Sequence, residues 1–351
     1  MRAPVTHILP LTSIVRERLL PLPGTVHVKV NQTVSPGDTI AEASYSREHV
    51  LLEVARKLGV TNQAADRLIR CKVGENLQKD SLVAEKKGLI PKRITSPRAG
   101  RVVAAGGGQV LLELNETTIE LKAGIPGTVV QVIPEKGAVI QSAGALIQGI
   151  WGNGRIDTGL MLSLVESPDD VITPDRLDVS LRGSIILAGA CVDGEVLRIA
   201  AELPARGLIL SSLPPSLLPL ASQMRFPIIV TDGLNRLPMN QIAYKILTTN
   251  VKREVTINAE RLDRHAGKRP EIIIPLPVSQ EPQEPRSIDT LAPGQQVRIR
   301  RIPYSGVVGT LVNIRPGLST LPSGLRVHTA EVQLENNEQI LVPLVNLEII
   351  G

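Results

Sequence analysis

Three arrangements of apolar residues divide this chain of 351 residues. Between residues 20 and 150, short apolar pairs alternate with glycine turns, which predicts many short strands. From residue 183 to about 247, near-continuous apolar runs alternate with amphipathic stretches, which predicts buried parallel strands separated by helices. From residue 289 to 351, apolar residues recur at every second position between glycines, which predicts a small, strongly bent antiparallel barrel.

The first part, residues 1–150, repeats one unit of strand, glycine turn and strand. The units occupy residues 22–41, 73–84, 94–103 and 124–147. A repeated unit of this kind predicts a flattened β-sandwich built from two similar halves.

These units resemble the barrel-sandwich hybrid fold of biotinyl and lipoyl carrier domains. The points of likeness are V-S-P-G-D-T-I-A at residues 34–41 and I-T-S-P-R-A-G at residues 94–100. The resemblance places the modified lysine of a carrier five residues before the isoleucine of the second phrase, where this chain has Leu89; the later copy has Glu116 there. Neither side chain can form the amide that attaches biotin or lipoate. The resemblance therefore implies a structural sandwich, and we expect no cofactor.

A segment inside these repeats, at about residues 47–70, predicts an inserted helical hairpin. Val50, Leu51, Val54 and Leu58 fall at helical spacing, and Gly59 suits a C-cap. Thr61 is then the expected N-cap of a second short helix. Two interpretations are open: a cover over the sandwich, which we favour, or a DNA-reading helix-turn-helix using basic residues of the hairpin. Those basic residues are Arg56, Lys57, Arg67 and Arg70.

The middle part, residues 151–275, predicts an α/β domain. Strands are expected at 184–190, 208–210 and 226–231, with helices at 195–201, 216–224 and 238–247. Asp193 and Asp232 follow strand ends, where ligands bind in such folds, although Asp-Gly is also a common turn. The sequence shows no nucleophile, base or metal site at the spacing that catalysis needs, so we expect a protein that is not an enzyme.

A Pro-rich linker is predicted at residues 276–288, before the barrel of residues 289–351. The barrel resembles the KOW module of NusG-type transcription factors and ribosomal proteins, with I-P-Y-S-G at residues 302–306 in place of the family's G-P-F-x-G turn. The resemblance implies contact with RNA, a ribosomal protein or polymerase. The implied contact residues are Arg298, Arg300, Arg301 and Tyr304, with Arg326 on a neighbouring strand.

Composition narrows these expectations. The net charge of +5 is mild for nucleic-acid binding, and aromatic residues, at 1%, offer few surfaces on which bases could stack. Cys71 and Cys191 share no metal-ligand spacing, which is typical of buried thiols in a reducing compartment. The chain shows neither a signal peptide nor an apolar run long enough to span a membrane, so we expect a cytoplasmic protein.

Together these patterns predict a multidomain, β-rich protein. The favoured function is a non-catalytic scaffold or adaptor that presents β-modules to a protein partner or to copies of itself. One alternative is a KOW-domain factor that associates with nucleic acid or with the transcription or translation machinery. The other is a degenerate carrier or ligand-binding α/β protein with a site near Asp193 and Asp232.

Overall fold

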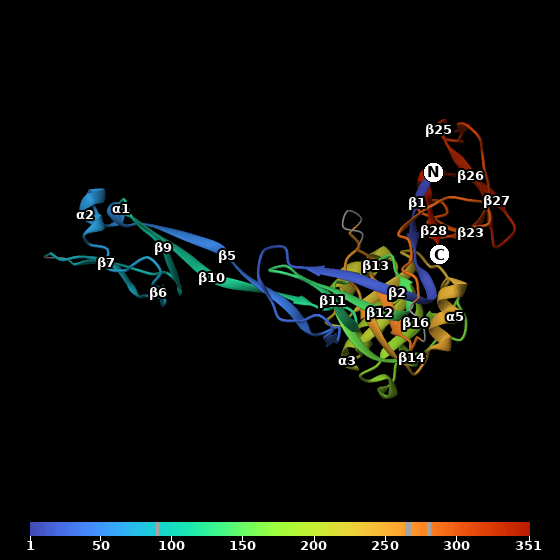
Figure 1. Cartoon of the computed structure of the whole chain (residues 1–351), viewed down its shortest axis with the longest axis horizontal. Coiled ribbons are helices and arrows are strands. Elements are labelled where there is room, and N and C mark those ends of the chain that lie inside the picture. Colours follow the sequence, from blue (N-terminus) through green and yellow to red (C-terminus); the bar gives the residue numbers. More distant parts are fainter. Residues whose placement is uncertain (89–90, 264–267, 279–281) are drawn as a thin grey trace.

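The structure is a computed structural model that describes residues 1–88, 91–263, 268–278 and 282–351; the side chains of residues 46–47 and 115–117 also lie outside the description. Strands predominate, as the sequence predicts, and their main sheets have twelve, seven and five strands. The molecule is elongated: a body holds both termini, and a two-stranded ribbon leads from it to a small distal module (Figure 1). No helix in the described part of the chain is long and apolar enough to cross a membrane.

The ribbon consists of β5 (Thr39–Glu53) and β10 (Gln109–Lys122). They pair antiparallel from Thr39 opposite Lys122 to Glu53 opposite Gln109. We call residues 39–47 and 115–122 the arm, and residues 48–114 the head. The head also contains α1 (Val54–Leu58), α2 (Asn62–Asp66), β6 (Asn76–Leu77), β7 (Leu82–Lys86), β8 (Lys92–Thr95) and β9 (Gly100–Gly106).

The predicted helical hairpin is wrong in its first half, because β5 continues to Glu53 and helix α1 begins only at Val54. Leu52 is buried and lies opposite Val110, whereas Leu51 lies opposite Leu111 and is exposed. The run V-L-L-E-V satisfies both the helical and the strand period, and long-range pairing with β10 selects the strand. Gly59 is the left-handed C-cap that the sequence predicts.

The four repeated units separate into two groups that form separate cores. The outer units give β3 (Thr25–Val26), β4 (Thr33–Val34), β11 (Gly127–Ile133) and β12 (Gly137–Gln148) in the body, and the inner units give β6 to β9 in the head. The body core contains Val34, Ile40, Ile125, Val129 and Ile140. The head core contains Leu77, Val83, Ile94, Val102 and Leu112.

The two groups share the same backbone hydrogen bonds. In the body, the Asn31 N–H donates to the Val129 carbonyl at 2.8 Å; in the head, the Gly74 N–H donates to the Val102 carbonyl at 2.8 Å. The return bonds also match, since Val129 donates to the Gln32 carbonyl and Val102 to the Glu75 carbonyl, both at 2.9 Å. The equivalent positions differ by 43 residues on one strand (31 to 74, 32 to 75) and by 27 on the other (102 to 129). One small unit thus occurs twice, and the arm inserts the second copy into the first.

The middle of the chain forms the predicted strand and helix alternation, which we call the central layer. Its strands β16 (Ile185–Cys191), β17 (Gly207–Ser212) and β18 (Ile228–Gly233) are parallel neighbours. Their alternate residues enter two cores, because both faces of the strands are covered: Ile186 and Leu208 belong to one, Leu187 and Ile209 to the other.

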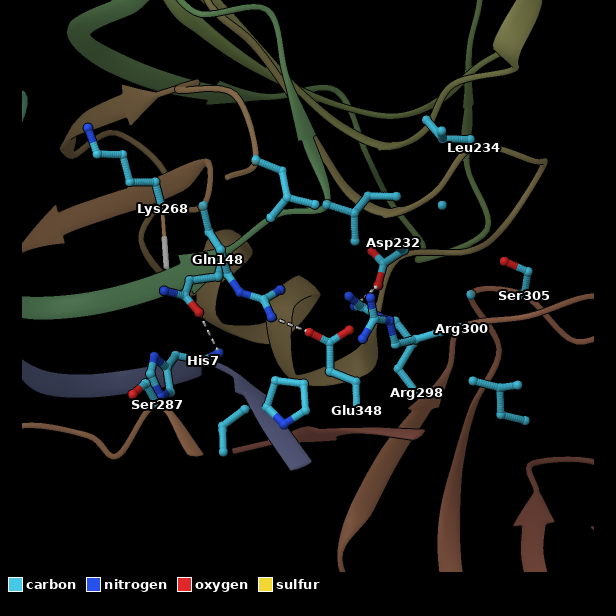
Figure 2. A pocket seen from close by; sticks show the side chains of 18 of the residues that line it. His7, Gln148, Asp232, Leu234, Lys268, Ser287, Arg298, Arg300, Ser305 and Glu348 are labelled. Atoms are coloured by element: carbon cyan, nitrogen blue, oxygen red, sulfur yellow. Dashed lines mark hydrogen bonds and ion pairs between the residues drawn. The ribbon is translucent and has the colours of Figure 1, made fainter. Parts of the chain in front are cut away.

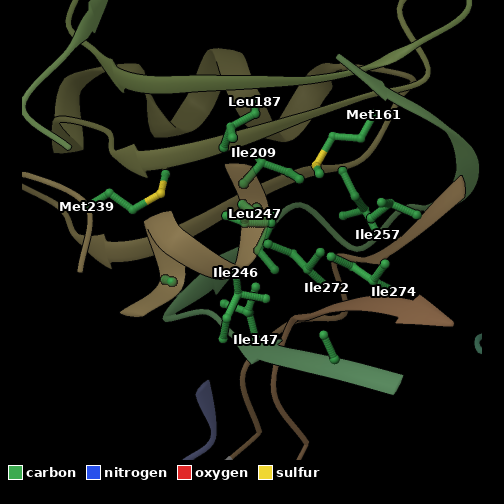
Figure 3. Close-up of a cluster of buried hydrophobic side chains, with 14 of the residues drawn as sticks. Ile147, Met161, Leu187, Ile209, Met239, Ile246, Leu247, Ile257, Ile272 and Ile274 are labelled. Carbon is green, nitrogen blue, oxygen red and sulfur yellow. The ribbon is translucent and has the colours of Figure 1, made fainter. Parts of the chain in front are cut away.

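Helices cover both faces of the central layer. Helices α3 (Gly194–Glu202) and α4 (Leu218–Gln223) contribute to the first core. On the other face, Ile246 and Leu247 of α5 (Gln241–Thr249) meet residues of the parallel strands and of β20 (Glu271–Pro275) (Figure 3).

The central layer continues into the body copy of the repeated unit within one twelve-stranded sheet. Strand β14 (Ile156–Ser163) pairs with β16 on one side and with β19 (Glu254–Asn258) on the other. Strand β20 then joins β19 to β12, and β2 (Ile8–Leu19) also pairs with β12. Hydrogen bonding therefore crosses the boundary predicted at residue 150.

The last part of the chain forms a sheet of seven strands, the C-terminal sheet, which the N-terminal strand enters. The order is β21 (Ile288–Thr290), β1 (Arg2–Thr6), β28 (Leu347–Ile350), β22 (Gln296–Ile299), β23 (Val308–Ile314), β26 (Thr329–Leu334) and β27 (Gln339–Pro343). Among the described residues no pairing joins the outer strands β21 and β27, so the sheet is open and the predicted closed barrel is not observed. A hairpin at Asn336-Asn337 joins β26 and β27, with Asn337 at a positive φ of 65°.

The described residues of the predicted linker lie along the first two strands. The Gln283 carbonyl accepts hydrogen bonds from the Ser13 N–H and the Thr12 hydroxyl, and the Ser287 carbonyl accepts one from the Val5 N–H. The C-terminal sheet is therefore fastened to the body rather than isolated from it.

Candidate functional site

A cleft of about 870 Å³ lies where the C-terminal sheet meets the first two strands and the central layer (Figure 2). Its volume is in the range of small-molecule sites. Segments from both ends of the chain line it, with apolar residues and charged residues in the same wall. The charged residues are Asp232, Asp263, Lys268, Arg269, Arg298, Arg300 and Glu348.

A buried ion pair joins two of these segments. Arg298 of β22 donates from Nη2 to Oδ1 of Asp232, at the end of β18, over 3.1 Å, and each side chain is 3% exposed. The Thr231 hydroxyl donates to the other carboxylate oxygen at 2.6 Å. Burial raises the pKa of Asp232 above its ordinary value, although Arg298 and the Thr231 hydroxyl act in the opposite direction.

Arg298 is only partly satisfied. Its Nε and Nη1 are buried and have no hydrogen-bond partner among the described residues. A guanidinium offers five N–H donors, and buried donors without a partner are unfavourable. Asp232 therefore holds the Arg298 side chain through Nη2, and the N–H groups on Nε and Nη1 make no hydrogen bond to a described residue.

A second ion pair lies beside the first. Arg269 pairs with Glu348 of β28, which also accepts a hydrogen bond from the Thr6 hydroxyl of β1. Burial alone would raise the pKa of Glu348, but Arg269, the Thr6 hydroxyl and Arg298 together lower it below its ordinary value. Glu348 is therefore a carboxylate that links both termini of the chain to Arg269, just before β20.

His7 lies at the base of the cleft with its backbone N–H donating to Oε1 of Gln148 at 3.0 Å. Its Nε2 is 3.0 Å from the Arg286 carbonyl, so the neutral ring donates from Nε2. Its Nδ1 is buried without a partner among the described residues. Burial is the main cause that lowers the pKa of His7.

The structure separates the five residues predicted to contact nucleic acid or protein. Arg298 and Arg300 line the cleft, and Arg298 is buried there. Arg301 and Arg326 are exposed. Tyr304 packs against the core of the C-terminal sheet and donates from its hydroxyl to Glu338 at 3.4 Å. Of the predicted set, Arg298 is therefore buried in the cleft, whereas Arg301 and Arg326 lie on the outer surface.

The two aspartates singled out at strand ends also separate. Asp232 reaches the cleft, whereas Asp193 caps helix α3 by accepting a hydrogen bond from the Glu195 N–H at 2.9 Å. Sequence reasoning missed Thr6, Arg269 and Glu348. Of these, only Glu348 carried a signal, since it is a carboxylate inside the apolar run L-E-I-I.

The described residues contain neither the position of the carrier lysine nor a group of side chains that could hold a metal ion. Leu89, at the position of the carrier lysine, and the side chain of Glu116 both lie outside the description. In the part of the chain that is described, no group of three or more His, Cys, Asp or Glu side chains is arranged to hold a metal ion. Burial raises the pKa of the Cys191 thiol to about 12, which keeps it protonated.

The head carries a different kind of candidate surface. Leu51, 52% exposed, lies opposite Leu111, which lies opposite Ala104, and residues opposite each other point to the same face. This face is the one turned away from the head core. Within the described residues, the strand pairing of His49–Glu53 is with β10 alone, so this length of β5 is a sheet edge.

The chain matches no model of a known protein family. It also matches no curated protein.

Proposed function

We propose that this protein is a non-catalytic scaffold or adaptor whose arm holds the head away from the body for a partner protein or a second copy of the chain. The observation that carries the proposal is the arm itself. Its part of β5, residues 39–47, is nine residues long and at about 3.3 Å per residue spans roughly 30 Å. A module that served only the stability of the body would pack against it, whereas this one stands clear (Figure 1).

The head supports its own fold. Every member of its core cluster lies between residues 50 and 114, so no side chain of the body contributes to that cluster. The arm is covered near the body, where β3 pairs with Glu42 and Ala41 and where Ala43 is buried. Beyond Ala43 the pairing of its described residues is that of a two-stranded ribbon, and such ribbons are only marginally stable in water. A partner that covers the arm or the head would offset this.

Two features of the head suit a protein partner. The outer face presents Leu51 and Leu111 side by side, and apolar contacts dominate the centre of protein interfaces. The edge at His49–Glu53 offers backbone groups to which a strand of a partner could be added. An exposed edge next to apolar side chains is the arrangement that strand addition requires.

The matched hydrogen bonds of the two repeated units support the proposal that both are barrel-sandwich hybrid units. The unit in the head has Leu89 where a carrier would have lysine, which favours display over group transfer. The ion pairs in the cleft join segments to one another, as expected of a junction between modules. We propose that the C-terminal sheet is a KOW-like module completed by β1.

The test is the mass of the intact particle purified under gentle salt, measured by native mass spectrometry. A homomeric mass above that of one chain, or a fixed complex with one protein, supports the scaffold. A monomer that binds nothing argues against it.

A second candidate, a factor that contacts nucleic acid, is favoured by one observation: Arg301 and Arg326 are exposed on the module that contains the KOW-like turn. Affinity for RNA would then fall as salt rises, and each of the two Arg→Ala variants would reduce the salt slope by about 1. Binding that is indifferent to both variants removes this candidate.

A further inference from the structure

The cleft contains a buried guanidinium group, that of Arg298, in which two nitrogens have no hydrogen-bond partner among the described residues. Arg298 is 2% exposed, and Asp232 engages Nη2 alone among its nitrogens. Nε and Nη1 have no partner among the described residues. Buried guanidinium groups in proteins usually meet carboxylate or phosphate oxygens through two N–H groups.

A second guanidinium approaches the same space. Arg300 follows Arg298 by two residues, so both lie on the same side of the chain as it leaves β22, and both line the cleft (Figure 2). Four cations line the cleft against three carboxylates. Two of these cations are paired within the cleft, Arg269 with Glu348 and Arg298 with Asp232, and Asp232 takes only one nitrogen of Arg298.

The cleft is larger than an inorganic anion needs, and part of its wall is apolar. Its apolar lining includes Ile150, Leu234, Leu262 and Ile288. Leu262 and Ile288 are 36% and 57% exposed, so the apolar wall is open to an incoming molecule. A ligand that fits has an anionic group at one end and an apolar body at the other.

We propose that this cleft binds a small organic anion, whose carboxylate or phosphate group is held by Arg298 and Arg300 and whose apolar part lies against Leu262 and Ile288. The site goes beyond the scaffold function, because it lies in the body and uses no residue of the head. A ligand there would contact the C-terminal sheet, the central layer and the N-terminal strand at once, and would stabilise their junction.

The experiment is calorimetric titration of the full chain with four probes: phenyl phosphate, benzoate, inorganic phosphate and benzamide. We expect saturable binding of phenyl phosphate or benzoate, and the stronger of the two identifies phosphate or carboxylate as the anionic group. Inorganic phosphate, without an apolar part, and benzamide, without charge, should each bind at least about tenfold more weakly. No saturable binding of either aromatic anion up to about 10 mM overturns the proposal, as does equal binding of benzamide.

Variants locate the site. Arg300→Gln should weaken the binding of the better anion by about tenfold or more, whereas the exposed neighbour Arg301→Gln should leave it unchanged. The double variant Arg298→Gln with Asp232→Asn replaces the buried ion pair by a neutral pair and should abolish binding; circular dichroism checks that it folds. Binding that survives both the Arg300 variant and the folded double variant places the anion elsewhere and contradicts the proposal.

Discussion

Arg298 and Asp232, 66 positions apart in the sequence, form an ion pair of 3.1 Å in which each side chain is only 3% exposed. The pair joins β22 of the C-terminal sheet to β18 of the central layer. Arg269 and Glu348 form a second such link, and β1 pairs with β28. The C-terminal sheet is therefore a fixed part of the body, and the cleft is built into that junction.

Breaking the buried pair should destabilise the protein strongly. Asp232→Ala leaves the Arg298 guanidinium buried without its carboxylate, and such changes cost about 3–5 kcal/mol. Denaturant unfolding measures the loss of free energy. Arg301→Ala, at an exposed arginine three residues further along, should change stability by less than about 0.5 kcal/mol. Equal effects of the two variants would show that the pair does not hold the junction.

Acidification should destabilise the base of the cleft through His7. The pKa of His7 is lowered in the folded chain, mainly by burial, from an ordinary value of 6.5. Its contribution to stability is thus complete above pH 6.5 and is lost as pH falls below 6.5 toward the lowered pKa, at up to about 1.4 kcal/mol per pH unit. His7→Gln should remove this part of the pH dependence between pH 7.5 and 5.5 in thermal unfolding. Parallel curves for both proteins would refute the role of His7.

The two copies of the repeated unit should unfold independently of each other. A Cβ at Gly100 would lie 2.5 Å from the Glu113 carbonyl oxygen in the head, and one at Gly127 would lie 2.1 Å from the Gln141 carbonyl oxygen in the body. Each Gly→Ala variant should cost about 1–3 kcal/mol, because the backbone must shift. Hydrogen exchange should show lost protection in the head alone for Gly100→Ala and in the body alone for Gly127→Ala. Gly37→Ala is the control, since nothing lies within 4 Å of its Cβ. Loss of protection in both modules from either variant would mean that they form one cooperative unit.

The central layer could be predicted because its signals are local. The strands β16, β17 and β18 each begin with a continuous apolar run, and α3, the helix that follows β16, has a clear N-cap in Asp193. The repeated units were visible for the same reason, as glycine turns within short strands. Their sorting into two cores was not visible, because it depends on the pairing of β5 with β10 across the whole head.

The cleft could not be predicted from the sequence. Thr6 and Glu348 meet across 342 positions, and no local pattern relates them. The KOW resemblance implied that Arg298 contacts a partner. The side chain is buried instead, because its face of β22 packs against Asp232. The helix expected at Val50 and Leu51 failed for the same reason, since the partner strand lies some sixty residues further along the chain.

The central claim is that the head is displayed for a protein partner, and a matched pair of substitutions in native mass spectrometry tests it most directly. Leu51 on the head and Leu160 on β14 of the body are both exposed strand leucines, at 52% and 49%. Wild-type chain and Leu160→Glu should give the same assembled mass, homomeric or with a partner, whereas Leu51→Glu should give the free chain. Assembly that survives Leu51→Glu, or that is lost only with Leu160→Glu, would contradict the account.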